Sequence, residues 1–476
     1  MIETTIHTRA GGTVTVPGTT LEALRTSVSG EVLVSGDGGY DEARAIWNGM
    51  IDRRPALIAT CRNTRDVQAA VRFAAEHDLL TTVRGGGHNI AGSAVADGAL
   101  MIDLSQMREV RVDPELRVAH VEGGALLSDV DAATQEHGLA VPLGINSTTG
   151  VAGLTLGGGF GWLSRKHGLT VDSLISAEVV TADGRRVVAS EDENEDLFWA
   201  LRGGGGNFGV VTAFEFRLHP LGPEVLSGLI VHPFEDARSV LREYRAFAEQ
   251  APDDVSVWVV LRKAPPLPFL PEEWHGREVL VLAAFYAGSM EEGEQALKPL
   301  RDIGDPIADV IGPHPYAGWQ QAFDPLLTPG ARNYWKSHDF TQLDDGMLDT
   351  VMEHVATLPS PECEVFIAQL GGATGRISPD ATAYPHRATR YIMNVHTRWS
   401  DPEGDTPCVK WARELFEATA PYASGSVYVN FMPEDEVARI GAAYGPNYDR
   451  LVELKQRWDP DNRFRANQNI RPVTEA

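Results

Sequence analysis

The stretch TTVRGGGHNIAG, residues 81–92, decides the interpretation of this chain. An apolar run leads into three consecutive glycines, and His88 and Asn89 follow them. A glycine run after a strand can turn its N–H groups towards phosphate oxygens. The spacing matches neither Gly-x-Gly-x-x-Gly nor the P-loop pattern, so an ordinary Rossmann site or an NTPase is disfavoured. Taken alone, the loop fits a ligand cradle or a tight turn with a hydrogen-bonded histidine.

The residues before that loop predict a small α/β unit. RPALIATC, residues 54–61, is typical of a buried strand, and LLTTV, residues 79–83, of a second one. Between them, residues 63–79 have apolar positions at helical spacing, and Asn63 or Thr64 can cap that helix. Residues 1–40, by contrast, are expected to form a weakly structured lead-in.

The length of 476 residues predicts two or more domains. Short strands separated by turns are expected from about residue 100 to 220. Residues 221 to about 435 alternate strands with helices, which predicts an antiparallel sheet with helices on one face. The tail, residues 444–470, predicts a helix followed by an extended segment.

The net charge of −25, from 41 basic and 66 acidic residues, disfavours nucleic acid or an anionic membrane as a partner. A solvated surface explains the charge better than adaptation to salt or attraction of cationic substrates. Three cysteines give no disulfide framework and no Cys-x-x-Cys metal pattern. The N-terminus has no secretory pattern and no apolar run reaches about 18 residues, so a cytoplasmic protein, monomeric or homodimeric, is expected.

Two further segments are crowded with glycine: residues 142–174 and residues 196–218. Such density indicates backbone packed against a large flat or phosphorylated ligand, while a core strand pair with bulges is the alternative. Together with the loop of residues 84–89, these segments favour a bound dinucleotide.

At this point the chain resembles a known family. It is similar to the berberine-bridge-enzyme-like branch of the vanillyl-alcohol-oxidase type of FAD-linked oxidoreductases. The resemblance spans residues 43 to about 470. The motifs that carry it are RGGGHN (84–89), MIDLS (101–105), GGGFGWLSRKHGLTVDSL (157–174), DLFWALRGGGGNFGVVT (196–212), NYWKS (333–337), YPHR (384–387) and DPDNRFRANQNI (459–470).

The resemblance implies an α+β fold with a PCMH-type two-subdomain FAD-binding domain and an α+β substrate domain built on an antiparallel sheet. The FAD-binding domain would comprise residues 1–218 with a C-terminal return, 440–476. The substrate domain would comprise residues 219–439. The change of sequence texture near residue 220 is consistent with this division.

The resemblance also implies FAD bonded covalently through its 8α carbon to His88. An imidazole on the flavin ring raises its reduction potential and prevents loss of the cofactor. Amide side chains at Asn467, Gln468 and Asn469 suit the pyrimidine edge, which both donates and accepts hydrogen bonds. The predicted cofactor-binding residues are Arg84, Gly85, Gly86, Gly87, His88, Asn89, Gly92, Asn146, Thr149, Gly150, Gly153, Gly158, Gly159, Gly161, Asp172, Gly209, Val210, Val211, Asn467 and Asn469.

Two positions distinguish this chain from relatives with a doubly attached flavin. Asn146 stands where those relatives have the second linking cysteine, so attachment through His88 alone is expected. Thr149 occupies the family's oxygen-gating position and is close in shape to the valine of oxidases. The resemblance therefore implies an oxidase that transfers hydride from a small organic substrate (an amine, an alcohol or sugar, or an intermediate of secondary metabolism) to flavin. Dioxygen is the expected acceptor, giving hydrogen peroxide.

The family's usual catalytic bases are both replaced. Phe431 stands where some relatives have a tyrosine, and Asn394 where others have a carboxylate. Either the substrate needs no strong base or another residue acts. The predicted catalytic residues are Tyr428, Lys336, Tyr334 and Asn394, with His396 as a further candidate base. A dehydrogenase with another electron acceptor and a flavin-binding protein that has lost catalysis are the alternatives.

Overall fold

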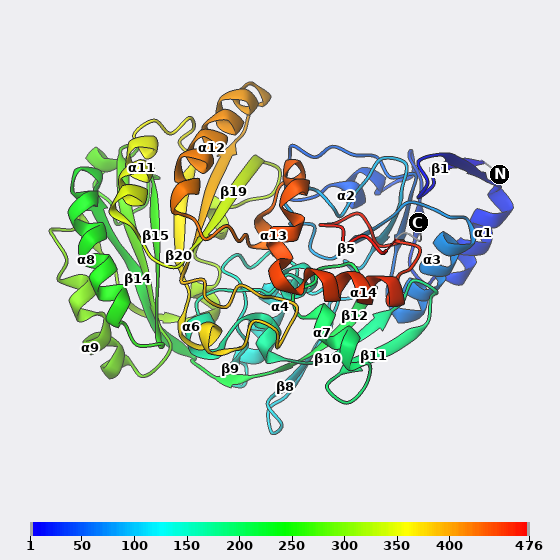
Figure 1. Ribbon diagram of the computed structural model, residues 1–476, viewed down its shortest axis with the longest axis horizontal. Helices are drawn as coiled ribbons and strands as arrows, with labels where there is room; N and C mark the ends of the chain where they lie inside the picture. Colours follow the sequence, from blue (N-terminus) through cyan, green and yellow to red (C-terminus); the bar gives the residue numbers. More distant parts are fainter. Residues whose placement is uncertain (1–2, 474–476) are drawn as a thin grey trace.

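The computed structural model describes residues 3–473. The fold is α+β, as predicted, with one group of sheets formed mainly by the N-terminal half and a larger sheet formed by the later residues (Figure 1). None of the helices in this described part of the chain is long and apolar enough to cross a membrane.

The N-terminal lead-in is more structured than the sequence suggested. Its elements are β1 (Thr4–His7), β2 (Thr13–Val16), α1 (Gly18–Ser27), β3 (Val32–Leu33) and α2 (Tyr40–Arg44). Strands β1 and β2 pair with each other. Ile6, Val16, Leu21 and Leu24 are buried in one core with the following α/β unit. The expectation was wrong because each element is too short to show a clear hydrophobic period.

The α/β unit is confirmed. Its four-stranded sheet has the order β3-β4-β6-β5, and β4 (Leu57–Thr60) and β5 (Thr81–Arg84) both run parallel to β6 (Leu100–Asp103). Helix α3 (Thr64–Glu76) connects β4 to β5. The Asn63 side chain caps it by accepting hydrogen bonds from the backbone N–H groups of the first turn. Strand β5 ends where the glycine loop begins.

A second sheet follows, with the strand order β11-β10-β12-β8-β7. Its strands are β7 (Val110–Asp113), β8 (Val118–Glu122), β10 (Leu174–Val180), β11 (Arg186–Ser190) and β12 (Val210–Arg217). Four helices belong to the same part of the chain: α4 (Leu127–Gln135), α5 (Val151–Leu156), α6 (Ser164–His167) and α7 (Glu195–Leu201). A small ribbon joins β9 (Leu139–Ala140) to β13 (His219–Pro220).

The later residues form an eight-stranded antiparallel sheet, as predicted, with the order β17-β14-β16-β15-β20-β21-β19 and with β18 also paired to β14. Its strands are β14 (Glu224–Pro233), β15 (Val255–Lys263), β16 (Glu278–Tyr286), β17 (Ala308–Asp309), β18 (Gly312–Pro315), β19 (Arg332–Phe340), β20 (Glu364–Gln369) and β21 (Tyr391–Trp399). Its helices are α8 (Ala237–Gln250), α9 (Met290–Arg301), α10 (Tyr316–Trp319), α11 (Asp345–Val355) and α12 (Asp405–Thr419).

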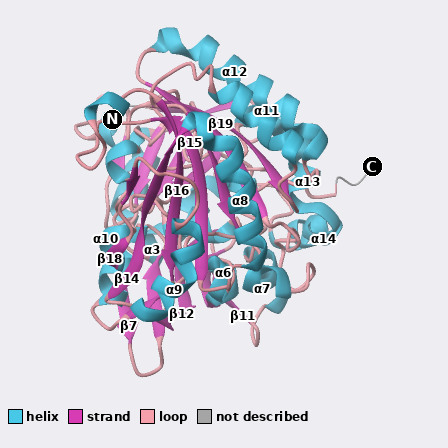
Figure 2. Cartoon of the chain, turned by 90° about the vertical axis from the view of Figure 1, so that its left-hand side faces the viewer, coloured by secondary structure: helices cyan, strands magenta, loops and turns pink. Residues whose placement is uncertain are grey.

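Helices α8, α9, α11 and α12 lie over the outer face of that sheet (Figure 2). Strand alternation explains how the two faces differ. On β15, Val257 and Val259 pack into the core beneath the helices, whereas Trp258 and Val260 face the opposite side and line a cavity. The inner face of the sheet is therefore available for a ligand.

The C-terminal segment returns to the first half of the molecule, with α13 (Ile440–Tyr444) and α14 (Tyr448–Trp458) lying beside the second sheet (Figure 1). Buried Lys455 anchors this return. Its Nζ donates to the carbonyl oxygens of Asn207 and Phe464 and lies 2.8 Å from an Asp459 oxygen. The tail after α14 is thereby held against the glycine-rich region.

Candidate active site

One cavity joins the glycine loops to the inner face of the eight-stranded sheet. Residues 85–89, 146, 149, 150 and 153 contribute to the first wall, and Asn467 of the C-terminal return also lines the cavity. Strands β14, β15, β16, β19, β20 and β21 contribute the opposite wall. The two walls come from segments far apart in sequence, so the site exists only when both halves of the chain are folded together.

The first wall is bare backbone. A Cβ atom added to Gly86 would lie 2.3 Å from the backbone nitrogen of Gly150, and one added to Gly150 would lie 2.3 Å from that of Gly86. The two loops therefore cross in direct backbone contact, which only glycine allows. A wall of backbone without side chains is the kind of surface that can cradle a pyrophosphate.

His88 follows this cradle and is held on both sides. Its ring stacks on Trp47 with the centroids 5.2 Å apart, and its Nε2 lies 3.0 Å from Oγ1 of Thr148. Burial lowers the pKa of His88 to about 4, so the ring is neutral near pH 7. Thr148 donates its own hydroxyl proton to Asn146. Oγ1 therefore accepts a hydrogen bond from Nε2–H, which leaves the lone pair of the ring on Nδ1.

About half of the predicted cofactor-binding residues line the cavity. These are Gly85, Gly86, Gly87, His88, Asn89, Asn146, Thr149, Gly150, Gly153 and Asn467. The others do not line the cavity, and their expected role in binding the cofactor stays a prediction. These are Arg84, Gly92, Gly158, Gly159, Gly161, Asp172, Gly209, Val210, Val211 and Asn469.

The second glycine cluster lies in close contact with protein neighbours. A Cβ on Gly158 would lie 2.9 Å from the Tyr384 ring, and one on Gly159 would lie 2.2 Å from Oγ1 of Thr170. These glycines admit protein neighbours, as does Gly161, whose Cβ would lie 1.9 Å from a carbonyl oxygen. A close approach requires glycine whether the neighbour is a ligand or a side chain.

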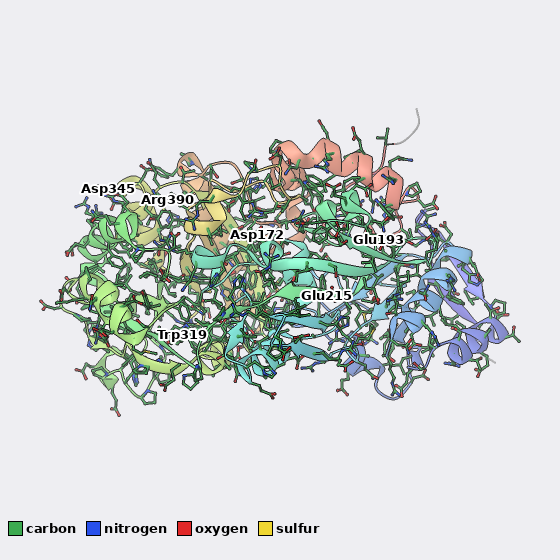
Figure 3. All side chains as sticks on the ribbon, turned by 90° about the horizontal axis from the view of Figure 1, so that it is seen from below. Asp172, Glu193, Glu215, Trp319, Asp345 and Arg390 are labelled. Atoms are coloured by element: carbon green, nitrogen blue, oxygen red, sulfur yellow. The ribbon has the colours of Figure 1, made fainter. Side chains whose placement is uncertain are left out.

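Three of the predicted residues outside the cavity lining have structural partners. Asp172 lies near the centre of the molecule (Figure 3) and accepts hydrogen bonds of 2.7 and 2.9 Å from Arg387. Arg84 donates to the carbonyl oxygen of Ala43. A Cβ on Gly92 would meet the side chain of Ile51. Each residue stabilises the protein around the cavity.

Gly209, Val210 and Val211 lead into the second sheet. A Cβ on Gly209 would lie 2.5 Å from a methyl group of Val179, so this glycine lets β10 and β12 pack closely. Val210 and Val211 are buried core residues of β12. Packing within the sheet accounts for the burial of both valines.

The C-terminal tail supplies acceptors that suit a ligand. Asn467 donates from Nδ2 to the carbonyl oxygens of Gly206 and Phe464, while its buried Oδ1 has no protein partner. The buried Oδ1 of Asn469 is also without a protein partner, although Asn469 does not line the cavity. A buried acceptor normally has a donor, so the Asn467 oxygen fits the edge of a flavin ring. The backbone cradle, His88 and this amide together fit FAD.

Two of the four predicted catalytic residues line the cavity. The hydroxyl oxygen of Tyr428 accepts hydrogen bonds from Gly159 N and Asn430 Nδ2, and burial raises the pKa of Tyr428 to about 12. Tyr428 therefore retains its proton and can donate it in a hydrogen bond. Asn394 is fully buried on β21, and neither polar atom of its side chain has a protein partner.

The other two, Tyr334 and Lys336, lie on the opposite face of β19 from the cavity-lining Trp335. Lys336 Nζ is 3.1 Å from carboxylate oxygens of both Asp435 and Glu436. Tyr334 donates to the second oxygen of Asp435 at 2.7 Å. The expectation that either residue acts as the base is corrected, because strand alternation points both away from the cavity.

Sequence reasoning missed the charged residues of the sheet wall. Arg262, Glu364 and His396 all line the cavity, and only His396 was among the candidates. The signal that might have found the others is a charge at an inward-facing position of an otherwise apolar strand. Arg262 follows Trp258 and Val260 at two-residue spacing in this way.

The fold and the cavity define an FAD-binding oxidoreductase. Residues 55–190 match the model of an FAD binding domain, and residues 427–471 match that of a berberine and berberine-like family. An FAD-linked oxidoreductase of Bacillus subtilis is 31% identical, covering 94% of this chain and 98% of its own length. The (R)-6-hydroxynicotine oxidase of Paenarthrobacter nicotinovorans is also 31% identical, with the same coverage.

Solved structures of similar enzymes have the same fold. The crystal structure of 6-hydroxy-D-nicotine oxidase from Arthrobacter nicotinovorans superposes with a TM-score of 0.84 at 29% identity, covering 94% of this chain and 99% of its own. A xylooligosaccharide oxidase from Myceliophthora thermophila gives 0.82 at 26% identity, covering 95% and 99%. The chain belongs to the berberine-bridge-enzyme-like family of FAD-linked oxidoreductases, and its cofactor is FAD.

Proposed function

We propose that this enzyme is an oxidase that holds FAD covalently through His88, takes hydride from a small organic substrate and passes the electrons to dioxygen, giving hydrogen peroxide. The observation that carries the proposal is the state of His88. It is a neutral imidazole beside the cradle, with a lone pair on Nδ1. A neutral ring nitrogen is a nucleophile, which formation of a bond to the flavin requires.

The residues around His88 would orient this nucleophile. Trp47 fixes the plane of the ring, and Thr148 with Asn146 fixes its tautomer. Asn146 thus has a structural role at the position where doubly linked relatives have cysteine, which supports attachment through His88 alone. FAD, when bound, supplies the hydride acceptor and the route of electrons to oxygen.

The proposal also covers the electron acceptor, the domain boundaries, the location, the oligomeric state and the kind of substrate. Thr149 lines the cavity at the oxygen-gating position, and its valine-like shape supports dioxygen as the acceptor. We also propose an FAD-binding domain of residues 1–218 with 440–476, a substrate domain of residues 219–439, a cytoplasmic location and a monomer or homodimer. Two relatives are named as oxidases of 6-hydroxynicotine and of xylooligosaccharides, which supports a small-molecule substrate.

Acid precipitation tests the covalent bond. The precipitated protein is expected to stay yellow, whereas His88→Ala should release its flavin into the supernatant. His137→Ala is the matched control, because His137 is exposed at the end of α4. A colourless pellet from the unmodified protein would overturn covalent attachment.

Stopped-flow reoxidation tests the oxidase assignment. After reduction with dithionite, the flavin is expected to be reoxidised rapidly by dissolved oxygen. Sluggish reoxidation by oxygen together with fast reoxidation by a quinone would instead identify a dehydrogenase. If no compound in a broad substrate screen bleaches the flavin, the result would favour a flavin-binding protein that has lost catalysis.

A further inference from the structure

Resting on the proposed function, we infer that the substrate carries an extended, uncharged apolar chain, and that one row of side chains on the sheet wall binds this chain. The row is called the apolar track below and consists of Phe366, Val260, Val281 and Val231. The inference names the substrate class of the same active site.

The register of the sheet aligns the apolar track. Phe366 on β20 lies directly opposite Asn394 on β21 and, on its other side, opposite Val260 on β15. Val281 on β16 lies opposite Val260 and, on its other side, opposite Val231 on β14. Residues directly opposite each other on neighbouring strands point to the same face, and all five line the cavity. Four strand spacings place Val231 about 19 Å from Asn394.

The track is narrow where it crosses β15 and β20. Trp258 and Arg262 lie two residues from Val260 on either side, so all three share one face of β15. Trp258 stacks on Phe366 with the centroids 5.4 Å apart, and Arg262 reaches Glu364 at 2.6 Å. These two contacts border the track on its two sides. The floor between them is a single row of side chains, which suits a chain better than a fused ring system.

The charged border does not require a charged ligand. Burial alone would raise the pKa of Glu364, but Arg262 and His396 outweigh it and hold the pKa below its usual range. Glu364 is therefore an anion that is paired with the Arg262 cation, and its other oxygen lies 3.2 Å from Nδ1 of His396. A charged group or a row of hydroxyl groups on the track would lack partners among the valines, which is costly. The bound chain is therefore uncharged and apolar.

The connection from β15 to β16 closes the far end of the track. Its residues Leu267 and Phe269 line the cavity, and buried Leu270 packs in one cluster with Val231 and Val279. Prolines at positions 265, 266, 268 and 271 restrict the backbone of this connection. The apolar cap is thereby preformed, and Leu270 limits the length of chain that the track accepts.

Aromatic contacts identify the end of the track that faces the flavin. Trp335 on β19 lies 5.7 Å from Trp47, which stacks on His88 at 5.2 Å, both measured between ring centroids. Strand β19 is the neighbour of β21, whereas β14 lies near the opposite edge of the sheet. The reacting end of the substrate thus belongs at the β21 end, and its chain extends along the track towards β14.

A series of primary alcohols from 1-butanol to 1-dodecanol tests the track on the flavin-loaded enzyme. Perturbation of the flavin absorption gives the Kd, and isothermal titration calorimetry measures it independently of the spectrum. The Kd is expected to fall about fourfold for each added methylene group. The fall should stop at about ten carbons, because Asn394 and Val281 are about 14 Å apart and an extended chain advances about 1.2 Å per bond.

Two variants should move this limit in opposite directions. Val281→Phe fills the track one strand spacing earlier, so the limit should shorten by about four carbons while the Kd of 1-butanol is unchanged. Leu270→Ala removes the side chain that closes the far end, so the limit should lengthen. If Leu270→Ala does not fold, Val281→Phe decides alone.

Val437→Phe is the matched control for Val281→Phe. Val437 is 59% exposed and lies outside the cavity lining, so the same substitution there should leave the limit at about ten carbons. A limit that shortens equally in both variants would show that the effect does not come from the track.

A Kd that does not change with chain length, or one that continues to fall through 1-dodecanol, would overturn the inference. An unchanged limit in Val281→Phe would do the same. The acid pellet and the reoxidation of dithionite-reduced enzyme do not involve the track. Failure of those two measurements would count against the proposed function, and failure of the alcohol series alone against the apolar track.

Discussion

The two walls of the cavity are built differently. On the flavin side the wall is backbone, with Gly86 and Gly150 in direct contact and His88 as the principal reactive side chain. On the substrate side the wall is side chains from six strands of one sheet. A backbone wall recognises its ligand without depending on side-chain identity, whereas a side-chain wall can change residue by residue with the substrate.

This difference explains what the sequence predicted. The flavin wall comes from local segments, so RGGGHN directly after a predicted strand identified His88 and its glycines. Local reasoning had a limit even there, because the glycine cluster at 157–161 has the same appearance although Gly158 and Gly159 contact protein side chains. Which neighbour fills the space beside a glycine depends on tertiary packing.

On the substrate wall the fold was predictable but the site was not. The antiparallel sheet followed from alternating strands and helices, but the face on which each β19 side chain lies was not predicted, and Trp335 rather than Lys336 lines the cavity. Glu364 was missed because its significance depends on the residue opposite it, His396, across a strand pair. Register between strands that are far apart in sequence is not encoded in either strand alone.

The largest expected effect comes from separating the two glycine loops that cross in the backbone wall. Gly86→Ala would place a Cβ 2.3 Å from the Gly150 nitrogen, so the loops must separate at a cost of about 3 kcal/mol in the free energy of unfolding. The variant should be purified with little or no flavin. Flavin absorbance per protein and thermal unfolding measure the two effects.

Gly85→Ala is the control for that variant. A Cβ at Gly85 would have its nearest neighbour at 3.4 Å, which is ordinary contact, so unfolding should change by less than about 1 kcal/mol. Equal loss of stability in both variants would show that the crossing of the two loops is not what makes glycine necessary.

The next effect tests a contact between the two halves of the chain, which carry the two walls. Asp131 of α4 is fully buried, and one of its oxygens lies 3.2 Å from Nε2 of Gln320, just after α10. Burial raises the pKa of Asp131 to about 7. The folded protein therefore retains a proton that the unfolded chain loses near pH 4. This stabilising contribution is complete below that value and is lost as the pH rises through about 7.

Because of Asp131, the free energy of unfolding is expected to fall by about 1 kcal/mol per pH unit as the pH rises from 5 to 7. Asp131→Asn should remove that slope, because an amide is neutral throughout. Asp129→Asn on the same helix alters the exposed pair with Arg108 and should retain it. Urea unfolding at several pH values makes the measurement, and identical slopes in all three proteins would contradict the assignment.

The smallest effect concerns Asn394, the residue of the sheet wall with no hydrogen-bond partner for either polar atom of its side chain. A buried amide without partners destabilises a protein, so Asn394→Leu should stabilise the enzyme by about 1 kcal/mol. Asn394→Asp should have the opposite effect, because it buries a carboxylate without a counter-ion. If the leucine variant is more stable but its flavin is no longer reduced by compounds that reduce the flavin of the unmodified enzyme, the amide is retained for the ligand. If the leucine variant is less stable, Asn394 stabilises the fold, and this position of the side-chain wall is not reserved for contact with the substrate.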